Sequence, residues 1–264
     1  MKFDELDTKM RVFETANDRI VLPEIYMVAR IDGRSFTRLT KEVHAFEAPF
    51  DTGFRDMMAA TTEHLMDCGV RVVYGYTQSD EISLLLHRDE DTFGRKVRKL
   101  ESILAGEASA KFSLLLGSVA AFDCRLCELP NAALVRDYFR WRNEDAHRNA
   151  LSAHCYWALR KDGKNVNEAT GALLHMSVAD KNELLFQHGI NFNDVPNWQK
   201  RGIGLYWETY EKPAKNLKTG EAVTTLRRRI KKDYDLPMKE AYGEFVDGLI
   251  KEAASPTSWA NAIP

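Results

Sequence analysis

Three acidic residues stand where the sequence predicts the ends of strands. Asp32 follows an apolar stretch, and Asp80 and Glu81 lie between two further apolar segments. Carboxylates this close to apolar segments are costly to bury unless a cation neutralises them. If folding brings Asp32 and Asp80 together, their repulsion favours divalent cations between them. Oxygen ligands suit Mg²⁺, and a pair of such ions is typical of phosphoryl or nucleotidyl transfer.

Gly33 supports the same hypothesis. A residue without a Cβ directly after Asp32 lets a metal ion or a phosphate approach the backbone closely. The alternative is that Asp32 and Gly33 form an ordinary turn, and that Asp80 and Glu81 form an acidic hairpin tip in solvent. The residue types and their spacing leave both interpretations open.

A basic segment, "FGRKVRK" (residues 93–99), provides candidate phosphate ligands. Lys96 and Lys99 are three residues apart at the start of a predicted helix, and therefore share one face of it. Basic residues in a first turn oppose the helix dipole unless an anion binds there. A bound phosphate would meet that need, and a solvated charged face is the alternative.

The elements that must position these residues alternate in type. We predict a strand over residues 23–33, a helix from Asp51 to Gly69, strands over 70–76 and 82–87 joined as a hairpin, a helix beginning near Thr92, and a strand over 118–129. The order βαββαβ is the ferredoxin-like split unit, whose first and third strands pair at the centre. We therefore expect Asp32 and Asp80 at neighbouring strand tips, and we expect the sheet face without helices to stay open for function.

After Pro130 the pattern becomes mainly helical. We predict a helix over 132–160, whose apolar stripe includes Trp141, and a second helix that begins at a Ser177–Asp180 capping box. The remaining predictions are a strand over 202–210, a loop over 211–222, and a basic segment that leads into a last helix opened by Pro237.

Composition bounds the class of protein. The length of 264 residues fits one large domain, or one domain with a substantial extension. With 44% hydrophobic and 29% charged residues, the chain is expected to be globular. No apolar run reaches membrane-spanning length and the N-terminus is polar and acidic, so we expect a cytoplasmic protein without membrane association. The net charge of −2 excludes a uniformly basic surface but permits local basic patches.

Four cysteines are too few for a disulfide scaffold of this length. Cys124 and Cys127 form a CxxC motif, but no second pair and no nearby histidines stand at zinc-ligand spacing. Ordinary reduced thiols and a metal or redox pair are the two interpretations.

Two segments carry a family resemblance. "RIDGRSFTRLTK" (30–41) and "GYTQSDEISLLL" (75–86) resemble, in order and spacing, tRNA-histidine guanylyltransferases and the guanylyltransferase-like proteins related to them. Later segments, "DYFRWRNEDAHRNAL", "ADKNELLF" and "INFN", are similar as well, so the resemblance covers residues from about 20 to about 210. It implies an α+β fold, with a palm-like catalytic domain over 1–130, as in polymerases and nucleotide cyclases, and a mainly helical extension over 131–264 for RNA and oligomer contacts.

The resemblance also implies a reaction. Such enzymes add nucleotides to the 5′ end of tRNA in the 3′–5′ direction, with two Mg²⁺ (or Mn²⁺) ions as cofactors. ATP or GTP activates the 5′-phosphate, and the 3′-hydroxyl of an incoming nucleoside triphosphate then attacks it. The implied partners are tRNA, nucleoside triphosphates and further copies of the chain in a homotetramer.

The resemblance implies roles for individual residues. Asp32 and Asp80 would hold the metal ions as catalytic residues, with the Gly33 carbonyl assisting and Glu81 supporting the site. The nucleotide-binding candidates, which match or flank the family's positions, are Arg30, Arg34, Ser79, Lys96, Lys99, Lys181 and Asn191.

Other positions match residues that handle RNA and nucleotide transfer. His147 and Asp180 are two of them, although a packed histidine and a helix-capping aspartate are the simpler interpretations. The basic candidates for RNA backbone contacts are Arg136, Arg140, Arg142, Arg148, Arg227, Arg228 and Arg229. For these arginines, a solvated helix face or an oligomer contact is the alternative.

Two departures from the family pattern bear on function. Ala48 precedes Pro49 where the family often has a lysine, so Lys41 is the candidate to replace that triphosphate contact. Residues 147–153 read "HRNALSA", where enzymes dedicated to tRNA-histidine carry His-Ile-Asn-Asn-Leu-Tyr-Asn. We therefore predict template-dependent repair of 5′-truncated tRNA, with dedicated guanylation of tRNA-histidine as the alternative.

Two further activities are compatible with such a palm. A nucleotide cyclase or cyclic-dinucleotide synthase would share the fold and the metals, but would not account for "ADKNELLF" and "INFN". A non-catalytic RNA-binding relative would be expected to have lost an acid, whereas Asp32, Asp80 and Glu81 all remain.

Overall fold

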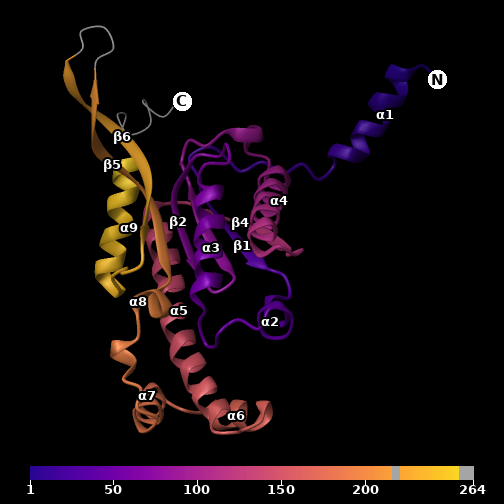
Figure 1. Ribbon diagram of the computed structural model, residues 1–264. Helices are drawn as coiled ribbons and strands as arrows, with labels where there is room; N and C mark the ends of the chain where they lie inside the picture. Colours follow the sequence, from indigo (N-terminus) through magenta and orange to yellow (C-terminus); the bar gives the residue numbers. More distant parts are fainter. Residues whose placement is uncertain (216–220, 256–264) are drawn as a thin grey trace.

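One six-stranded antiparallel sheet forms the centre of the protein, which a computed structural model describes over residues 1–215 and 221–255 (Figure 1). The strand order is β4-β1-β3-β2-β5-β6. The strands are β1 (Tyr26–Gly33), β2 (Val72–Gln78), β3 (Glu81–Leu86), β4 (Phe122–Leu129), β5 (Ile203–Lys215) and β6 (Ala222–Asp233). The predicted α+β class and the central pairing of β1 with β3 are both confirmed.

The first four strands and two helices follow the predicted βαββαβ order. Helices α3 (Thr52–Leu65) and α4 (Val97–Leu116) pack against the same face of the sheet. Asp51 caps α3 as expected, because its side chain accepts a hydrogen bond of 2.8 Å from the backbone N–H of Phe54. The apolar core under these helices includes Met27, Ala29 and Ile31 of β1 and Ile82, Leu84 and Leu86 of β3.

The start of α4 differs from the prediction. The helix begins at Val97, whereas the apolar pattern predicts a start near Thr92. The intervening residues Thr92–Arg95 form the 3₁₀ turn η2, in which Phe93 and Gly94 have left-handed backbone angles. Left-handed residues cannot continue a right-handed helix, so the turn separates the two segments.

Two further helices cover much of the face that we expected to be open. They are α5 (Ala132–Lys161) and α9 (Lys239–Ala253), which begins two residues after Pro237. The second apolar core lies between these helices and the sheet, where the buried hydroxyls of Tyr74 and Tyr242 lie 2.9 Å apart. The expectation of an open face is therefore wrong for most of the sheet, because the second half of the chain buries its own apolar side chains there.

The C-terminal half also extends the sheet. β5 and β6 pair along their whole described length, from Gly204 opposite Asp233 to Lys215 opposite Ala222. The predicted loop over 211–222 is therefore wrong, except that residues 216–220 lie outside the described part of the chain. In Figure 1 this hairpin projects well beyond the other strands.

The remaining helices are short or peripheral. They are α1 (Phe3–Thr15), α2 (Phe36–Arg38), the π-helical turn η1 (Leu39–Val43), α6 (Val166–Leu173), α7 (Val178–Gln187), η3 (Phe192–Asp194) and α8 (Asn197–Arg201). Helix α1 stands apart from the body and buries none of its residues (Figure 1). The predicted Ser177–Asp180 capping box opens α7. None of the described helices has both the length and the apolar character needed to cross a bilayer.

Candidate active site

The end of β1 and the tip of the β2–β3 hairpin meet at one end of the sheet. Asp32 lies opposite Glu81 in the β1–β3 register, and the backbone N–H of Gly33 donates a hydrogen bond of 2.9 Å to the carbonyl of Asp80. Ser79 has a left-handed backbone (φ 54°) that turns the chain at the tip. The expected adjacency of Asp32 and Asp80, 48 positions apart in sequence, is therefore present in the fold.

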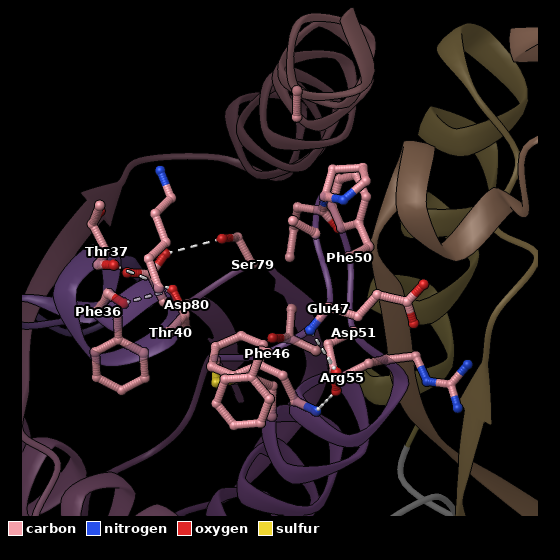
Figure 2. Close-up of a pocket in the computed structure, with 18 of the residues that line it drawn as sticks. Phe36, Thr37, Thr40, Phe46, Glu47, Phe50, Asp51, Arg55, Ser79 and Asp80 are labelled. Atoms are coloured by element: carbon pink, nitrogen blue, oxygen red, sulfur yellow. Dashed lines mark hydrogen bonds between the residues drawn. The ribbon is translucent and has the colours of Figure 1, made fainter. Parts of the chain in front are cut away.

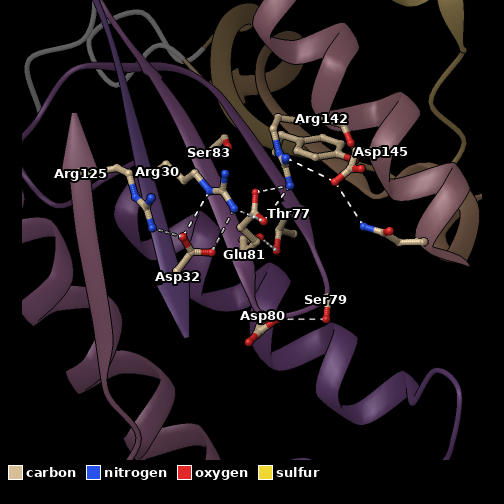
Figure 3. Close-up of polar contacts among 12 residues, drawn as sticks. Arg30, Asp32, Thr77, Ser79, Asp80, Glu81, Ser83, Arg125, Arg142 and Asp145 are labelled. Atoms are coloured by element: carbon tan, nitrogen blue, oxygen red, sulfur yellow. Dashed lines mark hydrogen bonds and ion pairs between the residues drawn. The ribbon is translucent and has the colours of Figure 1, made fainter. Parts of the chain in front are cut away.

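Glu81 is held by arginines. Nη2 of Arg30 and Nη2 of Arg142 each lie 2.7 Å from its carboxylate, as Figure 3 shows. Burial raises the pKa of Glu81, and the charges of Arg142 and Arg30 oppose that rise. The cations that compensate this buried acid thus belong to the protein itself, and they connect β1, β3 and α5. This arrangement supports a positioning role for Glu81, since the carboxylate is already engaged by two guanidinium groups.

Asp32 lies on the same sheet face as Glu81 and is also bound by arginines. Its carboxylate accepts a hydrogen bond of 2.9 Å from Nη2 of Arg125 on β4, and Nε of Arg30 lies 3.2 Å away (Figure 3). Arg30 therefore forms ion pairs with both Asp32 and Glu81. Its position does not support our expectation that it contacts a phosphate. Arg125 was not among the sequence-predicted residues, although it stands directly opposite Arg30 in the β1–β4 register.

Asp80 has a different environment. Its carboxylate accepts a hydrogen bond of 3.1 Å from the Ser79 hydroxyl, and it lies at the wall of a cavity of about 470 Å³. Within the described residues, no lysine, arginine or histidine lies within ion-pair distance of Asp80. Burial raises the pKa of Asp80, and the charge of Asp32 raises it further. Asp80 is thus a half-buried acid with no cation of the described residues beside it.

Several aromatic rings line the cavity next to Asp80 (Figure 2). The rings come from the segment between β1 and α3, from the first turn of α3, from the second half of α5 and from α8; they are Phe36, Phe46, Phe50, Phe54, Trp157 and Trp198. Ala48 and Pro49 form part of the same wall. Lys41 also lines the cavity, with its ammonium 5.7 Å from the ring centres of both Tyr156 and Trp157. This cavity combines stacking surfaces, one lysine and a half-buried acid, as a nucleotide site requires.

Lys96 and Lys99 do not reach this site within one chain. Lys96 forms an ion pair of 3.0 Å with Asp18 and a β-bridge with Ile20, both of which precede β1. Asp32 lies at the other end of β1, six positions after Tyr26 and therefore roughly 20 Å from it. The expectation that these lysines hold a phosphate beside the acids is therefore wrong for a single chain. The β3–α4 connection places the start of α4 at the far end of the sheet.

Two other nucleotide-binding candidates lie outside the cavity wall. Nζ of Lys181 on α7 donates a hydrogen bond of 3.0 Å to the Ser152 hydroxyl of α5. Asn191 caps η3 and donates a hydrogen bond of 2.9 Å to Asp194. The structure thus brings Ser79 to the cavity, but not Lys181 or Asn191. Arg34 is exposed just after the end of β1.

The candidate RNA residues of α5 differ in their contacts and in their exposure. Arg136 pairs with Asp247 at 3.4 Å and Arg140 pairs with Glu240 at 3.0 Å, so both arginines tie α5 to α9. Arg148 is 77% exposed and lies 3.9 Å from Asp145. Arg142 is buried and bound to Glu81, and its expected RNA contact is therefore wrong.

His147 packs against an aromatic ring. Its ring centre lies 5.3 Å from that of Phe192, and burial lowers its pKa, with the charge of Arg201 adding to the effect. Asp180, the other matched position, caps its own helix: its carboxylate accepts hydrogen bonds from Ser177. The simpler interpretations of both residues thus agree with their contacts.

Arg227, Arg228 and Arg229 lie on strand β6 and not on a helix face. Arg228 stacks on Trp207, with its guanidinium carbon 4.8 Å from the ring centre, and Arg229 lies 2.6 Å from Glu208. Arg227 is exposed opposite Tyr210. The basic segment is thus the edge strand of the projecting β5–β6 hairpin, and two of its arginines lie over aromatic rings of β5.

The side chains of Cys124 and Cys127 lie on opposite faces of the sheet and therefore cannot act together. Both lie on β4, where residues three apart point to opposite faces of the sheet. Cys124 packs against the core under α3 and α4, whereas Cys127 packs against the core under α5 and α9. The interpretation as a metal or redox pair is therefore wrong, and the motif consists of two separate reduced thiols.

Comparison with known proteins adds independent evidence. The family model described as tRNAHis guanylyltransferase matches residues 7–130, and the model described as Thg1 C terminal domain matches residues 133–242. A tRNA(His) guanylyltransferase of Debaryomyces hansenii is 32% identical over 75% of this chain and 79% of its own length. The Schizosaccharomyces pombe protein of that name is 34% identical over 70% of this chain and 74% of its own length. An Arabidopsis thaliana relative is 30% identical, and the match spans 39% of its length.

Solved structures agree with this assignment. A bacterial tRNA(His) guanylyltransferase (Thg1)-like protein in complex with ATP has a TM-score of 0.74 and 29% identity, covering 92% of this chain and 98% of that one. The same kind of bacterial protein in complex with GTP has a TM-score of 0.70 and 28% identity, covering 93% and 99%. The chain therefore belongs to the tRNAHis guanylyltransferase family of nucleotidyltransferases.

Proposed function

We propose that this enzyme adds nucleotides to the 5′ end of truncated tRNA in the 3′–5′ direction, directed by base pairing with a template. The observation that carries the proposal is the environment of Asp80. This half-buried acid has no cation of the described residues within ion-pair distance, accepts a backbone hydrogen bond from Gly33, the neighbour of Asp32, and lines a cavity of about 470 Å³ that includes aromatic rings. Such a place suits a metal ion, which Asp80 would help to hold and which would neutralise charge on a triphosphate.

The residues fit two Mg²⁺ ions as cofactors. Asp32, Asp80 and the Gly33 carbonyl would hold them, because hard oxygen donors are what Mg²⁺ prefers. In the part of the chain that the structure describes, no group of three or more acid, histidine or cysteine side chains could hold a metal ion. Phosphate oxygens of the substrate would therefore complete the coordination, as is usual for Mg²⁺. When bound, the ions lower the pKa of the attacking 3′-hydroxyl and neutralise charge on the phosphoryl groups.

The cavity residues would orient the activating nucleotide. Aromatic rings would give the base a stacking surface, and Ser79 and Lys41, which line the same cavity as Asp80, would contact the phosphates. Lys41 would replace the lysine that the family often has at the position of Ala48, because Lys41 and Ala48 line the same cavity. Exposed Arg34, next to Gly33, is a further phosphate ligand in this arrangement.

The distant candidates would act in an oligomer. Lys96 and Lys99 lie at the far end of the sheet, and Lys181 and Asn191 lie away from the cavity wall. In the homotetramer that we predict, these residues would contact a triphosphate or RNA held by another copy. The proposal thus assigns each active site to more than one chain.

Repair is favoured over dedicated addition to tRNA-histidine by the segment 147–153. This segment departs from the sequence of the dedicated enzymes, and its His147 is packed against Phe192 with a lowered pKa. A templated reaction needs only a Watson–Crick pair to place the incoming base, so the protein can recognise RNA by shape and backbone.

The decisive assay uses a 5′-labelled truncated tRNA with each nucleoside triphosphate in turn, alongside full-length tRNA-histidine. We expect extension by the nucleotide that pairs with the template, and little product from the full-length RNA. Extension restricted to guanylate on tRNA-histidine would instead identify dedicated guanylation. Product formed from nucleotide without RNA would identify a cyclase, and RNA binding without product would identify a non-catalytic relative.

A further inference from the structure

Helix α1 is not covered by any other part of the described chain. None of its 13 residues is buried, and Figure 1 shows the helix apart from the sheet and the other helices. A helix of this length is only marginally stable in water without tertiary packing. Its own contacts, such as the exposed ion pair of 2.8 Å between Arg11 and Asp7, stabilise it only slightly. A partner surface is therefore needed to cover the helix and keep it folded.

The apolar side chains of α1 form one narrow stripe. Its members follow one another at intervals of three, four and three residues, and between 42% and 77% of each is exposed; they are Phe3, Leu6, Met10 and Phe13. This is the spacing of the a and d positions of a heptad, which lie on one side of a helix, whereas Val12 lies on the opposite side. A stripe limited to a and d positions is the seam of a coiled coil, and it is narrower than the stripe of a helix that packs on a globular core.

Charged residues flank this stripe in a regular order. Lys2 and Lys9 occupy the g positions of the same heptads, and Asp7 and Glu14 occupy the e positions. In a parallel pair of helices, each g residue faces the e residue of the following heptad in the partner helix. Lys9 would then face Glu14 of a second copy, and Lys2 would face its Asp7, so that opposite charges meet at both places. In an antiparallel pair g faces g and e faces e, and like charges would meet.

These charges can serve a partner helix. Neither Lys9 nor Glu14 forms an ion pair with another described residue. Asp7 does pair with Arg11, which occupies a b position outside the seam, and both side chains of this pair are exposed. An exposed pair of this kind contributes little, and a carboxylate can accept further hydrogen bonds, so Asp7 can contact Lys2 of a second copy as well. The charges on both sides of the stripe therefore match a second α1.

We propose that α1 pairs with α1 of a second copy of this chain in a parallel, two-stranded coiled coil. Each apolar stripe is then covered by its symmetry equivalent, with the two-fold axis running along the pair. The pairing also connects with the predicted oligomer. Asp18, three residues after the end of α1, forms the ion pair of 3.0 Å with Lys96, which directly precedes α4. The paired helices would therefore bring the Lys96 regions of two copies to one interface.

Sedimentation equilibrium of the full chain tests the pairing. Met10→Asp places a carboxylate in the seam and should lower the association constant about tenfold or more. Val12→Asp makes the same change on the opposite side of the helix and should leave the constant unchanged. Lys9→Glu places two carboxylates opposite each other and should weaken association by about threefold, and the double variant Lys9→Glu, Glu14→Lys should restore it. Because α1 buries no residue in its own chain, these variants leave the body of the protein intact.

Cross-linking tests the orientation. In a parallel pair in register, each a position faces its own equivalent, so Met10→Cys should form a disulfide between two copies on oxidation, whereas Val12→Cys should not. The proposal is overturned if wild type stays monomeric, if Met10→Asp associates as strongly as wild type, or if Met10→Cys gives no more cross-linked dimer than Val12→Cys. Loss of association in Met10→Asp without that cross-link would mean instead that α1 packs against another surface of the second copy.

Discussion

The guanidinium of Arg142 lies 2.7 Å from the carboxylate of Glu81 and so links helix α5 to the hairpin that carries Asp80. The two residues come from different halves of the chain, 61 positions apart. Both are mostly buried, with 10% and 18% of their side chains exposed. Removing one partner of such a pair leaves the other charge unpaired. The resulting loss of folding free energy is far larger than the stabilisation that the intact pair contributes.

Arg142→Leu should therefore destabilise the fold. We expect the free energy of unfolding in urea to fall by about 1–3 kcal/mol, and not more, because Arg30 still pairs with Glu81. The matched control Arg148→Leu removes an exposed arginine from the same helix and should change the free energy of unfolding by less than about 0.5 kcal/mol. Equal effects of the two substitutions would contradict the role given to the Arg142–Glu81 pair.

Asp32→Asn and Asp80→Asn should each abolish nucleotide addition while RNA binding persists. Loss of metal-based charge stabilisation corresponds to a rate reduction on the order of 10³-fold or more. Addition of Mg²⁺ should raise the melting temperature of the wild type but not that of Asp80→Asn. Turnover like that of the wild type in either variant would refute the assignment of the metal ligands.

Asp80 should also give the stability a distinctive pH dependence. Burial raises its folded-state pKa above the ordinary value of 3.8, so the ionised form favours unfolding. Relative to Asp80→Asn, the wild type should be most stable below pH 3.8 and should lose that advantage as the pH rises through the folded pKa. Urea unfolding of both proteins from about pH 3 to about pH 8 measures this difference. An advantage of the wild type that grows with pH would mean that a cation of the protein holds Asp80.

Lys41→Ala should weaken nucleotide binding. Loss of one ammonium–phosphate contact predicts a rise in KM for the nucleoside triphosphate of about tenfold, with KM for RNA unchanged. Ala48→Lys in the Lys41→Ala background should restore the KM, because both positions line the same cavity. Lys251→Ala, an exposed lysine on α9, is the matched control. An unchanged KM in Lys41→Ala would exclude the phosphate contact.

Lys96→Ala and Asp80→Asn should complement each other. If Lys96 serves the active site of another copy, each variant alone is inactive, but mixed oligomers contain some sites with both residues intact. Co-refolded mixtures should then regain part of the wild-type rate. Asp18→Asn removes the ion pair of Lys96 within its own chain and controls for that contact. Full activity of Lys96→Ala alone would contradict the role in an oligomer.

Local sequence patterns determined much of the fold. The order βαββαβ, the Asp51 cap of α3 and the Ser177–Asp180 cap of α7 all depend on residues within a few positions of one another. The adjacency of Asp32 and Asp80 follows from the same order, because the first and third strands of this unit pair at the centre of the sheet.

Other features depend on contacts between distant segments, and local patterns carry no information about them. The sequence marks Arg142 as a basic residue on a helix, but only docking of α5 on the sheet brings it to Glu81. Lys96 has the spacing of a phosphate ligand, yet the β3–α4 connection places it at the far end of the sheet. Trp141 has the periodicity of a core residue and remains exposed, since helical spacing fixes the face of a helix but not what covers it. The sequence thus determined which residues could do the chemistry, whereas tertiary packing decided which of them meet.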